Sequence, residues 1–509
     1  NPGTPHALYP GMLATAQAAC LIGIEAHPVQ VEVRLGEGLP GFDIVGLPER
    51  GVRESRIRVR AALSSIGFAF PPRHLVLNLA PGDLPKTGAG LDLAIAASIL
   101  AACEAVAAEQ LASTLLVGEL SLSGELRPVR GVLALLRSAK QAGLQHAIIP
   151  EANRHEAMLV EGMSVHCAPH VGAVVRWLNS EAPLPEAEAP ALDPAALAEP
   201  ERDLGAIRGQ EAARRALEIA AAGRHHMLLI GSPGAGKTML ARALPSILPP
   251  PTSGEALEIA TIASSAGLRA PRILIGRQRP FRAPHHTASA AAIVGGGDPI
   301  RAGELTLAHR GVLFLDELPE FKRDAIETLR TTMEEGEVVI SWAKQRVRLP
   351  AEPMVVAAMN PCPCGYHGDP TRHCRCGEHQ IARYRSRVSG PLLDRFDLQV
   401  AVPRVSARTM REATRGEASK AVQGRVAHAR ARLGASAERS SLEALTQNVS
   451  KEALTLLELG VERLKMSARA YMKSLRVAHT IAALEDAAEV LPAHTAEALQ
   501  YRVLDREPA

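Results

Sequence analysis

The sequence has few aromatic residues and no strong excess of charge of either sign. Aromatic residues make up 3% of the 509 residues, and the formal net charge is only +3. Stacking on bases needs aromatic side chains, and a general attraction to nucleic acid needs excess Lys and Arg. The composition therefore excludes binding to nucleic acid through the whole surface, and any such contact must come from a local patch.

Long apolar runs and a secretory signal are also missing. No run reaches the roughly 18 apolar residues that a membrane span requires, and the first residues, Asn1 to Pro5, are polar and rich in turn formers. We therefore expect a cytoplasmic protein with no membrane partner, in which the seven cysteines do not form disulfides. Met12 is taken as the native start, with residues 1–11 a tag or an upstream extension.

A phosphate-binding loop lies in the middle of the chain. The pattern G-x-x-x-x-G-K-[ST] is formed by Gly231, Ser232, Pro233, Gly234, Ala235, Gly236, Lys237 and Thr238. In such a loop the backbone N–H groups cradle phosphates, the lysine contacts the β- and γ-phosphates, and the threonine hydroxyl is a ligand for Mg²⁺. A predicted strand precedes the loop and a predicted helix follows it. The motif predicts that the chain binds a nucleoside triphosphate.

The region around this loop has the pattern of an α/β domain. Apolar strands are predicted at 227–230, 312–315 and 355–358, and helical segments alternate with them. This alternation is typical of a parallel sheet covered by helices. We therefore predict an α/β core over 203–404.

The flanking regions differ in composition. A linker rich in Pro, Ala and Glu spans 181–202 and separates the core from an N-terminal domain at 12–180. That domain is predicted to be α+β, with strands at 29–35 and 75–79 and helices at 53–66 and 91–102. Residues 405–509 are predicted to form an all-helical lid, with long amphipathic helices at 443–459 and 466–489.

Polar residues follow two of the predicted core strands. Asp316 and Glu317 end the strand at 312–315, so they reach the sheet edge where the phosphate loop lies. There Asp316 can hold Mg²⁺ and Glu317 can act as general base toward water. Asn360 ends the strand at 355–358 and can orient that water, but an asparagine before a proline also fits an ordinary turn.

Two arginines are candidates for contact with the transferred phosphoryl group. Arg395 follows a short predicted helix, and an arginine that completes a neighbouring site would stabilise charge in the transition state. Arg469 opens a predicted lid helix and could touch the γ-phosphate. A surface ion pair explains Arg395 equally well, and an ordinary solvated charge explains Arg469 equally well.

Four of the seven cysteines lie within fifteen residues of one another. They form two C-x-C pairs with nine residues between them: Cys362, Cys364, Cys374 and Cys376. Alternate residues of an extended chain face the same side, so each pair can supply two thiolates to a tetrahedral Zn²⁺. We predict a structural zinc site, although reduced cysteines that pack a loop are the alternative. Three nearby histidines could replace a thiolate: His367, His373 and His379.

Longer segments of the chain together resemble the ComM/YifB family, a magnesium-chelatase-like branch of the AAA+ ATPases. The segments are 40–48 (PGFDIVGLP), 208–210 (RGQ), 282–287 (RAPHHT), 360–365 (NPCPCG) and 389–397 (SGPLLDRFD). The resemblance, which covers nearly the whole chain, implies that 231–238 is the Walker A motif. It makes Asp316 and Glu317 Walker B, Asn360 sensor 1, Arg395 a trans-acting finger and Arg469 sensor 2. It also implies ATP as the nucleotide and a homo-hexameric ring.

The N-terminal domain resembles the catalytic domain of Lon proteases, which has a ribosomal S5 domain 2-like fold. The segments 85–88 (PKTG) and 123–131 (SGELRPVRG) occur in the same order there. Lon-type cleavage needs a Ser nucleophile and a Lys base, but the corresponding positions here are Gly90 and Leu133. The resemblance therefore implies a binding or assembly module, and we expect no peptidase activity.

Two insertions would face the pore of such a ring and carry the contacts to DNA. The first spans about 279–301 and contains Arg282, His285, His286 and a run of three glycines at 295–297. Glycines suit a mobile loop whose N–H groups meet phosphates. Contacts within the protein or with a neighbouring subunit explain the two histidines equally well.

The second insertion is a predicted hairpin at 337–347. Lys344 and Arg346 share one face of a strand and could contact the DNA backbone, but a solvated strand face has the same pattern. Trp342 stands where the family resemblance leads us to expect a basic residue, which puts one DNA contact in doubt, although a tryptophan could stack on a base.

Taken together, the residues and the resemblance predict an ATP-dependent DNA helicase or translocase. It would act on single-stranded and branched DNA without sequence preference and promote branch migration during natural transformation and homologous recombination. The alternative is a motor that remodels a protein partner, as in metal chelatases. A third interpretation is a regulatory ATP switch that threads no substrate.

Overall fold

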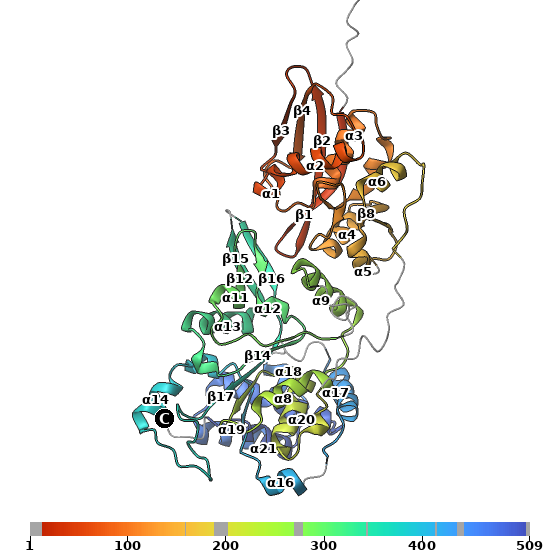
Figure 1. Ribbon diagram of the computed structural model, residues 1–509. Coiled ribbons are helices and arrows are strands. Elements are labelled where there is room, and N and C mark those ends of the chain that lie inside the picture. Colours follow the sequence, from red (N-terminus) through yellow and green to blue (C-terminus); the bar gives the residue numbers. More distant parts are fainter. Residues whose placement is uncertain are drawn as a thin grey trace, which may run out of the picture. The chain divides into compact units, whose positions relative to one another are not determined.

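A computed structural model of the chain describes residues 13–157, 159–187, 202–268, 278–342, 345–412, 415–434 and 442–504. These residues form two compact units, neither of which is continuous in sequence (Figure 1). Unit 1 comprises the described residues of 1–197, 256–276 and 297–302. Unit 2 comprises those of 198–255, 277–296 and 303–509.

Unit 1 is built on a seven-stranded mixed sheet. The strand order is β3 (Gly41–Val45), β4 (His74–Ala80), β2 (Glu25–Gly36), β1 (Leu13–Ile22), β5 (Thr114–Leu116), β8 (His146–Pro150) and β9 (Ser164–Ala168). The neighbours β1, β2 and β4 are antiparallel, whereas β1, β5, β8 and β9 run parallel. Val29, Val31 and Val33 are buried while the residues between them are more exposed, and the strand predicted at 29–35 is confirmed within β2.

Helices and one short hairpin complete unit 1. They are α1 (Arg50–Arg53), α2 (Ser55–Ser65), α3 (Asp92–Ala102), α4 (Val132–Gln141), α5 (Arg154–Ala157) and α6 (Val171–Leu178), with β6 (Glu119–Leu120) and β7 (Leu126–Arg127). Every residue of α3 is buried. Its one charged residue, Asp92, accepts a hydrogen bond from Arg58 Nε at 2.7 Å, which satisfies the buried carboxylate.

From Ala256 onward, helix α9 (Ser253–Ser265) belongs to unit 1, although it follows the phosphate loop in the sequence. Ala260 packs in the same apolar cluster as Leu133 and Leu136 of α4. The backbone N–H of Leu133 donates to the Ser264 hydroxyl at 3.3 Å. A segment of the predicted 203–404 region thus completes the core around α4.

Unit 2 contains a five-stranded sheet in which all strands are parallel. The order is β11 (Phe281–Arg282), β14 (Val312–Leu315), β17 (Met354–Met359), β10 (Met227–Ile230) and β18 (Leu398–Ala401). Every residue of β10, β14 and β17 is buried, as expected for strands covered on both faces. Their carboxyl ends lie at one edge, which brings the loops after these strands together.

Helices and a hairpin surround this sheet. The helices are α7 (Glu211–Gly223), α8 (Lys237–Ala243), α11 (Ala290–Val294), α12 (Glu304–Leu307), α13 (Arg323–Glu335), α14 (Glu378–Arg385) and α15 (Gly390–Leu393). The hairpin pairs β15 (Glu337–Trp342) with β16 (Gln345–Pro350). Two further short strands are β12 (Gly295–Gly296), which belongs to unit 2, and β13 (Arg301–Ala302), which belongs to unit 1.

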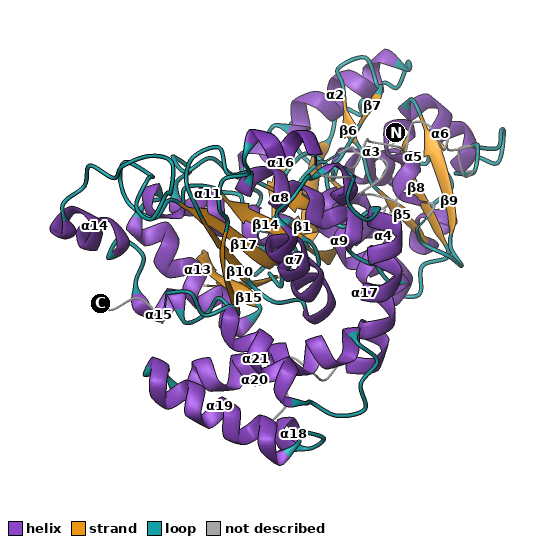
Figure 2. Ribbon diagram, turned by 90° about the horizontal axis from the view of Figure 1, so that it is seen from below, coloured by secondary structure: helices purple, strands orange, loops and turns teal. Residues whose placement is uncertain are grey.

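The C-terminal part is helical, as predicted (Figure 2). It consists of α16 (Ala407–Glu412), α17 (Ser419–Leu433), α18 (Leu442–Thr446), α19 (Lys451–Leu464), α20 (Ala468–Leu484) and α21 (Pro492–Gln500). The single helix predicted at 443–459 is wrong, because Asn448 has φ +59° and Ser450 caps a new helix by accepting from the Ala453 N–H. The helix predicted at 466–489 ends at Leu484.

None of the helices in the described ranges combines the length and apolar character that a bilayer crossing demands.

Candidate active site and cysteine cluster

The phosphate loop joins β10 to α8 at the centre of the parallel sheet. Gly231 lies so close to β18 that a Cβ atom would be 2.2 Å from the Val402 carbonyl oxygen. Gly234 and Gly236 have φ of +77° and +95°, which only glycine adopts without strain. These glycines turn the backbone so that the helix starting at Lys237 points its N-terminus at the loop.

Lys237 occupies the middle of the loop and is 8% exposed. Its Nζ atom donates to the carbonyl oxygens of Gly231 at 2.6 Å and Ser232 at 3.2 Å, and to Asn360 Oδ1 at 3.1 Å. Burial lowers the pKa of Lys237, and the nearby carboxylates of Asp316 and Glu317 oppose that shift. The ammonium thus lies among oxygen acceptors, as a group that binds phosphate oxygens must.

Thr238 and Asp316 bring two oxygen ligands together. The Thr238 hydroxyl donates to Asp316 Oδ2 at 2.8 Å, although the two residues come from α8 and from the end of β14. A hydroxyl and a carboxylate at this separation fit the hard oxygen ligands that Mg²⁺ prefers. The pair would hold Mg²⁺, which would neutralise phosphate charge at this edge of the sheet.

Glu317 stands next to Asp316 in the left-handed backbone region, with φ +55°. Its side chain is 53% exposed, and its Oε2 atom lies 3.3 Å from Nδ1 of His286. The sequence did not indicate this contact, because His286 precedes Glu317 by thirty-one residues and belongs to the first predicted insertion. The candidate general base is therefore in direct contact with a candidate substrate-binding segment.

Gln210 is a further residue at the loop that the sequence reasoning did not assign. Its Nε2 atom donates to the carbonyl oxygens of Ala235 at 3.0 Å and Pro403 at 2.5 Å. Gln210 has φ +58° and immediately precedes α7. It ties the start of α7 to the phosphate loop, and its only sequence signal was the matching segment 208–210.

Arg395 and Arg469 meet at Glu334 rather than at the phosphate loop. Arg395 is 6% exposed, and its guanidinium contacts Glu334 and donates to the Arg330 carbonyl oxygen at 3.0 Å. Arg469 is exposed and lies 3.6 Å from the same Glu334 carboxylate. The Arg395 hydrogen bond, followed by the charges of Arg395 and Arg469, lowers the pKa of Glu334.

The first insertion presents fewer free charges than its sequence suggests. Arg282 makes two hydrogen bonds to Glu304, at 2.6 and 2.7 Å, so its charge is largely neutralised. His285 Nδ1 lies 2.9 Å from the Thr287 hydroxyl, and the rings of His285 and His286 are 4.2 Å apart.

On the second insertion, the predicted hairpin forms, and its second strand extends to Pro350 rather than ending at 347. Arg346 is exposed on β16 opposite Ser341, and Arg348 pairs with Glu337 at 2.7 Å. Lys344 lies outside the described residues.

The two positions that correspond to the Lon catalytic pair have no polar side chain to contribute. Gly90 lies just before α3, where its carbonyl oxygen accepts from the Gly118 N–H at 3.0 Å. Leu133 is fully buried in the apolar cluster around α4.

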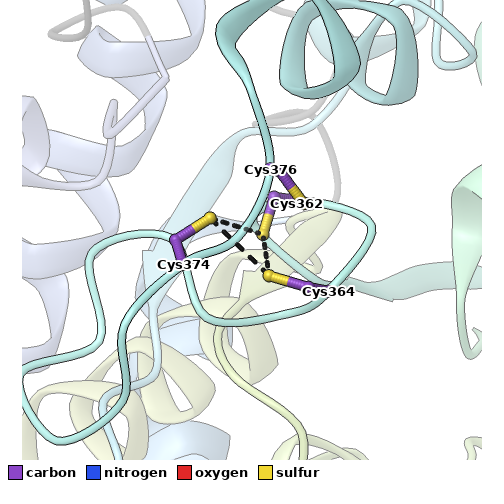
Figure 3. A group of neighbouring side chains, drawn as sticks. All are labelled: Cys362, Cys364, Cys374 and Cys376. Atoms are coloured by element: carbon purple, nitrogen blue, oxygen red, sulfur yellow. Dashed lines mark hydrogen bonds between the residues drawn. The ribbon is translucent and has the colours of Figure 1, made fainter.

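The four clustered cysteines converge on one point. Figure 3 shows side chains from the two C-x-C arms turned toward each other. The Sγ atoms of Cys362, Cys364 and Cys374 are 3.4 to 3.7 Å apart, and all four lie within 4.8 Å of one another. Within the described residues, this group consists of cysteines alone.

This geometry fits a tetrahedral thiolate site. Four sulfurs at about 2.3 Å from a Zn²⁺ ion lie about 3.8 Å from each other, and a disulfide would require about 2.05 Å. Backbone N–H groups of Arg375 and Tyr366 lower the pKa of the Cys364 thiol to about 6, which favours one thiolate in the group. Burial and hydrogen bonds with the neighbouring thiols raise the pKa of Cys374 and Cys376, although a backbone hydrogen bond opposes each shift. The His367 N–H donates to Cys362 Sγ at 3.3 Å, a supporting hydrogen bond of the kind metal sites use.

Comparison with known proteins identifies the family. Residues 203–410 match the family described as magnesium chelatase, subunit ChlI. Residues 31–153 and 416–502 match two further ChlI regions, the second described as C-terminal. The chain is 41% identical to the competence protein ComM of Haemophilus influenzae, over 97% of this chain and 98% of that protein. The chain belongs to the ComM/YifB family of magnesium-chelatase-like AAA+ proteins.

Other relatives agree with this assignment. The ComM/YifB relative from Escherichia coli, an uncharacterized protein named YifB, is 40% identical over 97% of this chain and 98% of its own length. A shorter similarity links the chain to Lon protease 2 of Bacillus subtilis, at 30% identity over 27% of each protein. The Lon-like α+β domain, the parallel-sheet P-loop domain and the helical C-terminal region expected from the sequence are thus confirmed. Membership in this AAA+ family also implies ATP and Mg²⁺ as cofactors and assembly into oligomers.

Proposed function

We propose that the protein is an ATP-driven DNA helicase or translocase that works as a homo-hexamer. Its task would be to drive branch migration while incoming DNA is integrated by homologous recombination in natural transformation. The substrate would be single-stranded or branched DNA of any sequence, held through its phosphate backbone. Hydrolysis of ATP would supply the energy for each step along the strand.

One observation carries this proposal. His286, in the insertion expected to contact the substrate, lies 3.3 Å from Glu317, the candidate general base. Any movement of the insertion on a bound strand changes the surroundings of Glu317, so substrate binding and hydrolysis are linked through one contact. A motor needs such a link, whereas a nucleotide-binding module without a substrate does not.

Each residue of the site has its own role in the proposed hydrolysis of ATP. Lys237 and the loop N–H groups bind the β- and γ-phosphates, and Glu317 accepts a proton from the attacking water while Asn360 orients it. Arg395 is proposed to reach the γ-phosphate of the adjacent subunit, which requires its release from Glu334. Arg469, which shares Glu334 with Arg395, is proposed to contact the nucleotide of its own subunit.

A structural Zn²⁺ held by Cys362, Cys364, Cys374 and Cys376 completes the proposed set of cofactors. Its support is the convergence of the four Sγ atoms described above. Metal analysis of protein purified without chelator should give one zinc per chain, and its absence would reject this site.

The biological setting rests on similarity. The Haemophilus influenzae relative is named a competence protein. A relative with this name that is 41% identical over nearly the full length supports a role in competence for this chain.

ATP turnover measured with and without DNA tests the proposal. We expect forked DNA and single-stranded DNA to raise the rate severalfold, with a steep decline as salt increases. Turnover that neither DNA changes would contradict the proposal.

A motor acting on a protein partner is the second candidate, because the three matched regions are all described as magnesium chelatase subunit regions. For such a motor, DNA would leave turnover unchanged and a partner protein would raise it. The same assay therefore separates the two candidates.

A further inference from the structure

The loop that carries the cysteines is packed directly against the phosphate loop. Gly365, in the first C-x-C turn, has φ +83°, and a Cβ atom there would lie 2.5 Å from Cδ of Pro233 and 3.9 Å from Cγ of Asn360. No residue other than glycine fits this position without displacing Pro233. The turn is therefore in contact with two elements of the nucleotide site at once.

The cysteine cluster determines the shape of this turn. The Gly365 N–H donates to the Cys362 carbonyl oxygen at 3.0 Å, and Cys362 Sγ lies 3.4 Å from Cys364 Sγ and 3.7 Å from Cys374 Sγ. Cys362 is fully buried, whereas the other three cysteines are only partly buried. Cys374 of the second arm thus contacts the turn through its sulfur atom.

Asn360 is also connected closely to the cysteine cluster. Asn360, which accepts from Lys237 at 3.1 Å, is separated from Cys362 only by Pro361. The Pro361 carbonyl oxygen accepts from Arg385 Nε of α14 at 3.3 Å. A shift of the first C-x-C arm would therefore move Asn360 relative to Lys237.

We propose that metal held by the four cysteines positions the phosphate loop, with Gly365 as the residue through which the position is transmitted to Pro233 and Asn360. The inference rests on the proposed zinc and nucleotide sites and goes beyond a structural role for zinc. The metal sets the affinity of this chain for nucleotide. Without the metal, the turn that contains Gly365 is no longer held against Pro233 and Asn360. Removal of the metal by a chelator would then stop the motor at the step of nucleotide binding.

The experiment uses the full chain and two readouts, zinc content by mass spectrometry and affinity for a fluorescent ATP analogue. The double variant Cys374→Ser/Cys376→Ser removes ligands from the arm farther from Asn360. We expect it to lose zinc and to bind nucleotide at least tenfold more weakly. Wild-type protein stripped with a chelator should lose affinity to the same extent and regain it when Zn²⁺ is added back.

Two glycine variants separate packing from metal binding. Gly365→Ala should keep zinc but bind nucleotide as weakly as the cysteine variant. Gly368→Ala is the matched control, because Gly368 also has positive φ (+76°) but a Cβ there meets no atom within 4 Å. It should keep both zinc and affinity. Circular dichroism of each variant verifies that the fold is retained.

Three results would overturn the inference. Metal-free protein that binds nucleotide like the wild type would show that the cluster does not position the loop. Equal affinities of Gly365→Ala and Gly368→Ala would remove the packing argument. Wild-type protein without zinc would reject the metal site itself, whereas a wild type that binds no nucleotide would instead reject the nucleotide site.

Discussion

Single residues of the nucleotide site account for most of the expected chemistry, and Glu317 is the most informative of them. Glu317→Gln keeps the size of the side chain but removes the proposed base. We expect the rate of hydrolysis to fall by about 10² to 10⁴ while affinity for ATP stays within about twofold. Turnover and fluorescent-nucleotide binding measure the two effects separately.

Lys237→Ala is the comparison for that variant. Because Lys237 is proposed to bind phosphate oxygens directly, its loss should weaken binding as well as hydrolysis. If Glu317→Gln hydrolysed ATP at the wild-type rate, the assignment of the base would be wrong.

Buried His225 predicts a pH dependence of stability. It lies just before β10, and its Nε2 atom is 2.8 Å from the Thr480 hydroxyl of α20. Burial lowers the pKa of His225 to about 4, although the Asp397 carboxylate opposes the shift. The unfolded chain, with a histidine pKa of about 6.5, gains the proton first as pH falls. Stability from this residue is therefore present above about pH 6.5 and lost progressively toward about pH 4.

Urea unfolding at pH 7 and pH 5 measures this effect. His225→Gln keeps a polar group near Thr480 but does not titrate, so its stability should change less between the two pH values than that of the wild type. An equal change in both proteins would exclude His225 as a source of the pH dependence.

The residues that the sequence identified are those whose roles are local. The glycines and Lys237 follow from the chemistry of phosphate binding, and Asp316 follows from its place at the end of a strand. The Glu317–His286 contact, the sharing of Glu334 and the packing of Gly365 on Pro233 all join distant parts of the chain. No spacing in one sequence encodes such contacts, because they depend on how loops fold over the sheet.

At the scale of elements, the strands around the site were easier to predict than the helices that follow. The buried strands at 227–230 and 312–315 have the predicted bounds, since short apolar runs between turns leave little choice. The helix expected at 443–459 is divided, because Asn448 has φ +59° and a capping serine at 450 begins a new helix. Amphipathic periodicity indicates helix but not where one helix ends and another begins.

The hairpin of β15 and β16 carries a prediction about DNA binding. Arg346 is exposed on β16, and Arg346→Ala should weaken binding to single-stranded DNA several-fold and reduce the dependence of log affinity on log salt by about one. Arg348→Ala is the matched control, because Arg348 is on the same strand face but pairs with Glu337. Fluorescence anisotropy across a salt series measures both. Equal effects of the two variants would remove the hairpin from the proposed DNA path.

At the scale of the whole molecule, the proposed ring places each active site between two subunits. Lys237→Ala and Arg395→Ala should each abolish most turnover when assayed alone. In mixed rings, some sites combine an intact phosphate loop from one variant with an intact Arg395 from the other, so part of the turnover should return. Unchanged inactivity after mixing, in rings verified by native mass spectrometry, would argue against action of Arg395 in trans.

The sequence alone also does not indicate how the chain divides into its two units. The linker at 181–202 suggests one boundary, but residues 256–268 and 297–302 belong with unit 1 although they follow the phosphate loop. Ala260 and Ser264 give no local signal of this, because their partners on α4 lie more than a hundred residues earlier. Family resemblance was needed to infer a ring at all, since no feature of one chain specifies its symmetry.

The central claim is that ATP hydrolysis in this protein drives movement along DNA. Strand displacement on a labelled forked duplex, with ATP and Mg²⁺, tests it most directly, and Glu317→Gln serves as the inactive comparison. The account predicts ATP-dependent release of the labelled strand by the wild type and none by the variant. If the wild type hydrolysed ATP but released no more strand than Glu317→Gln, the protein would not be the DNA motor proposed here.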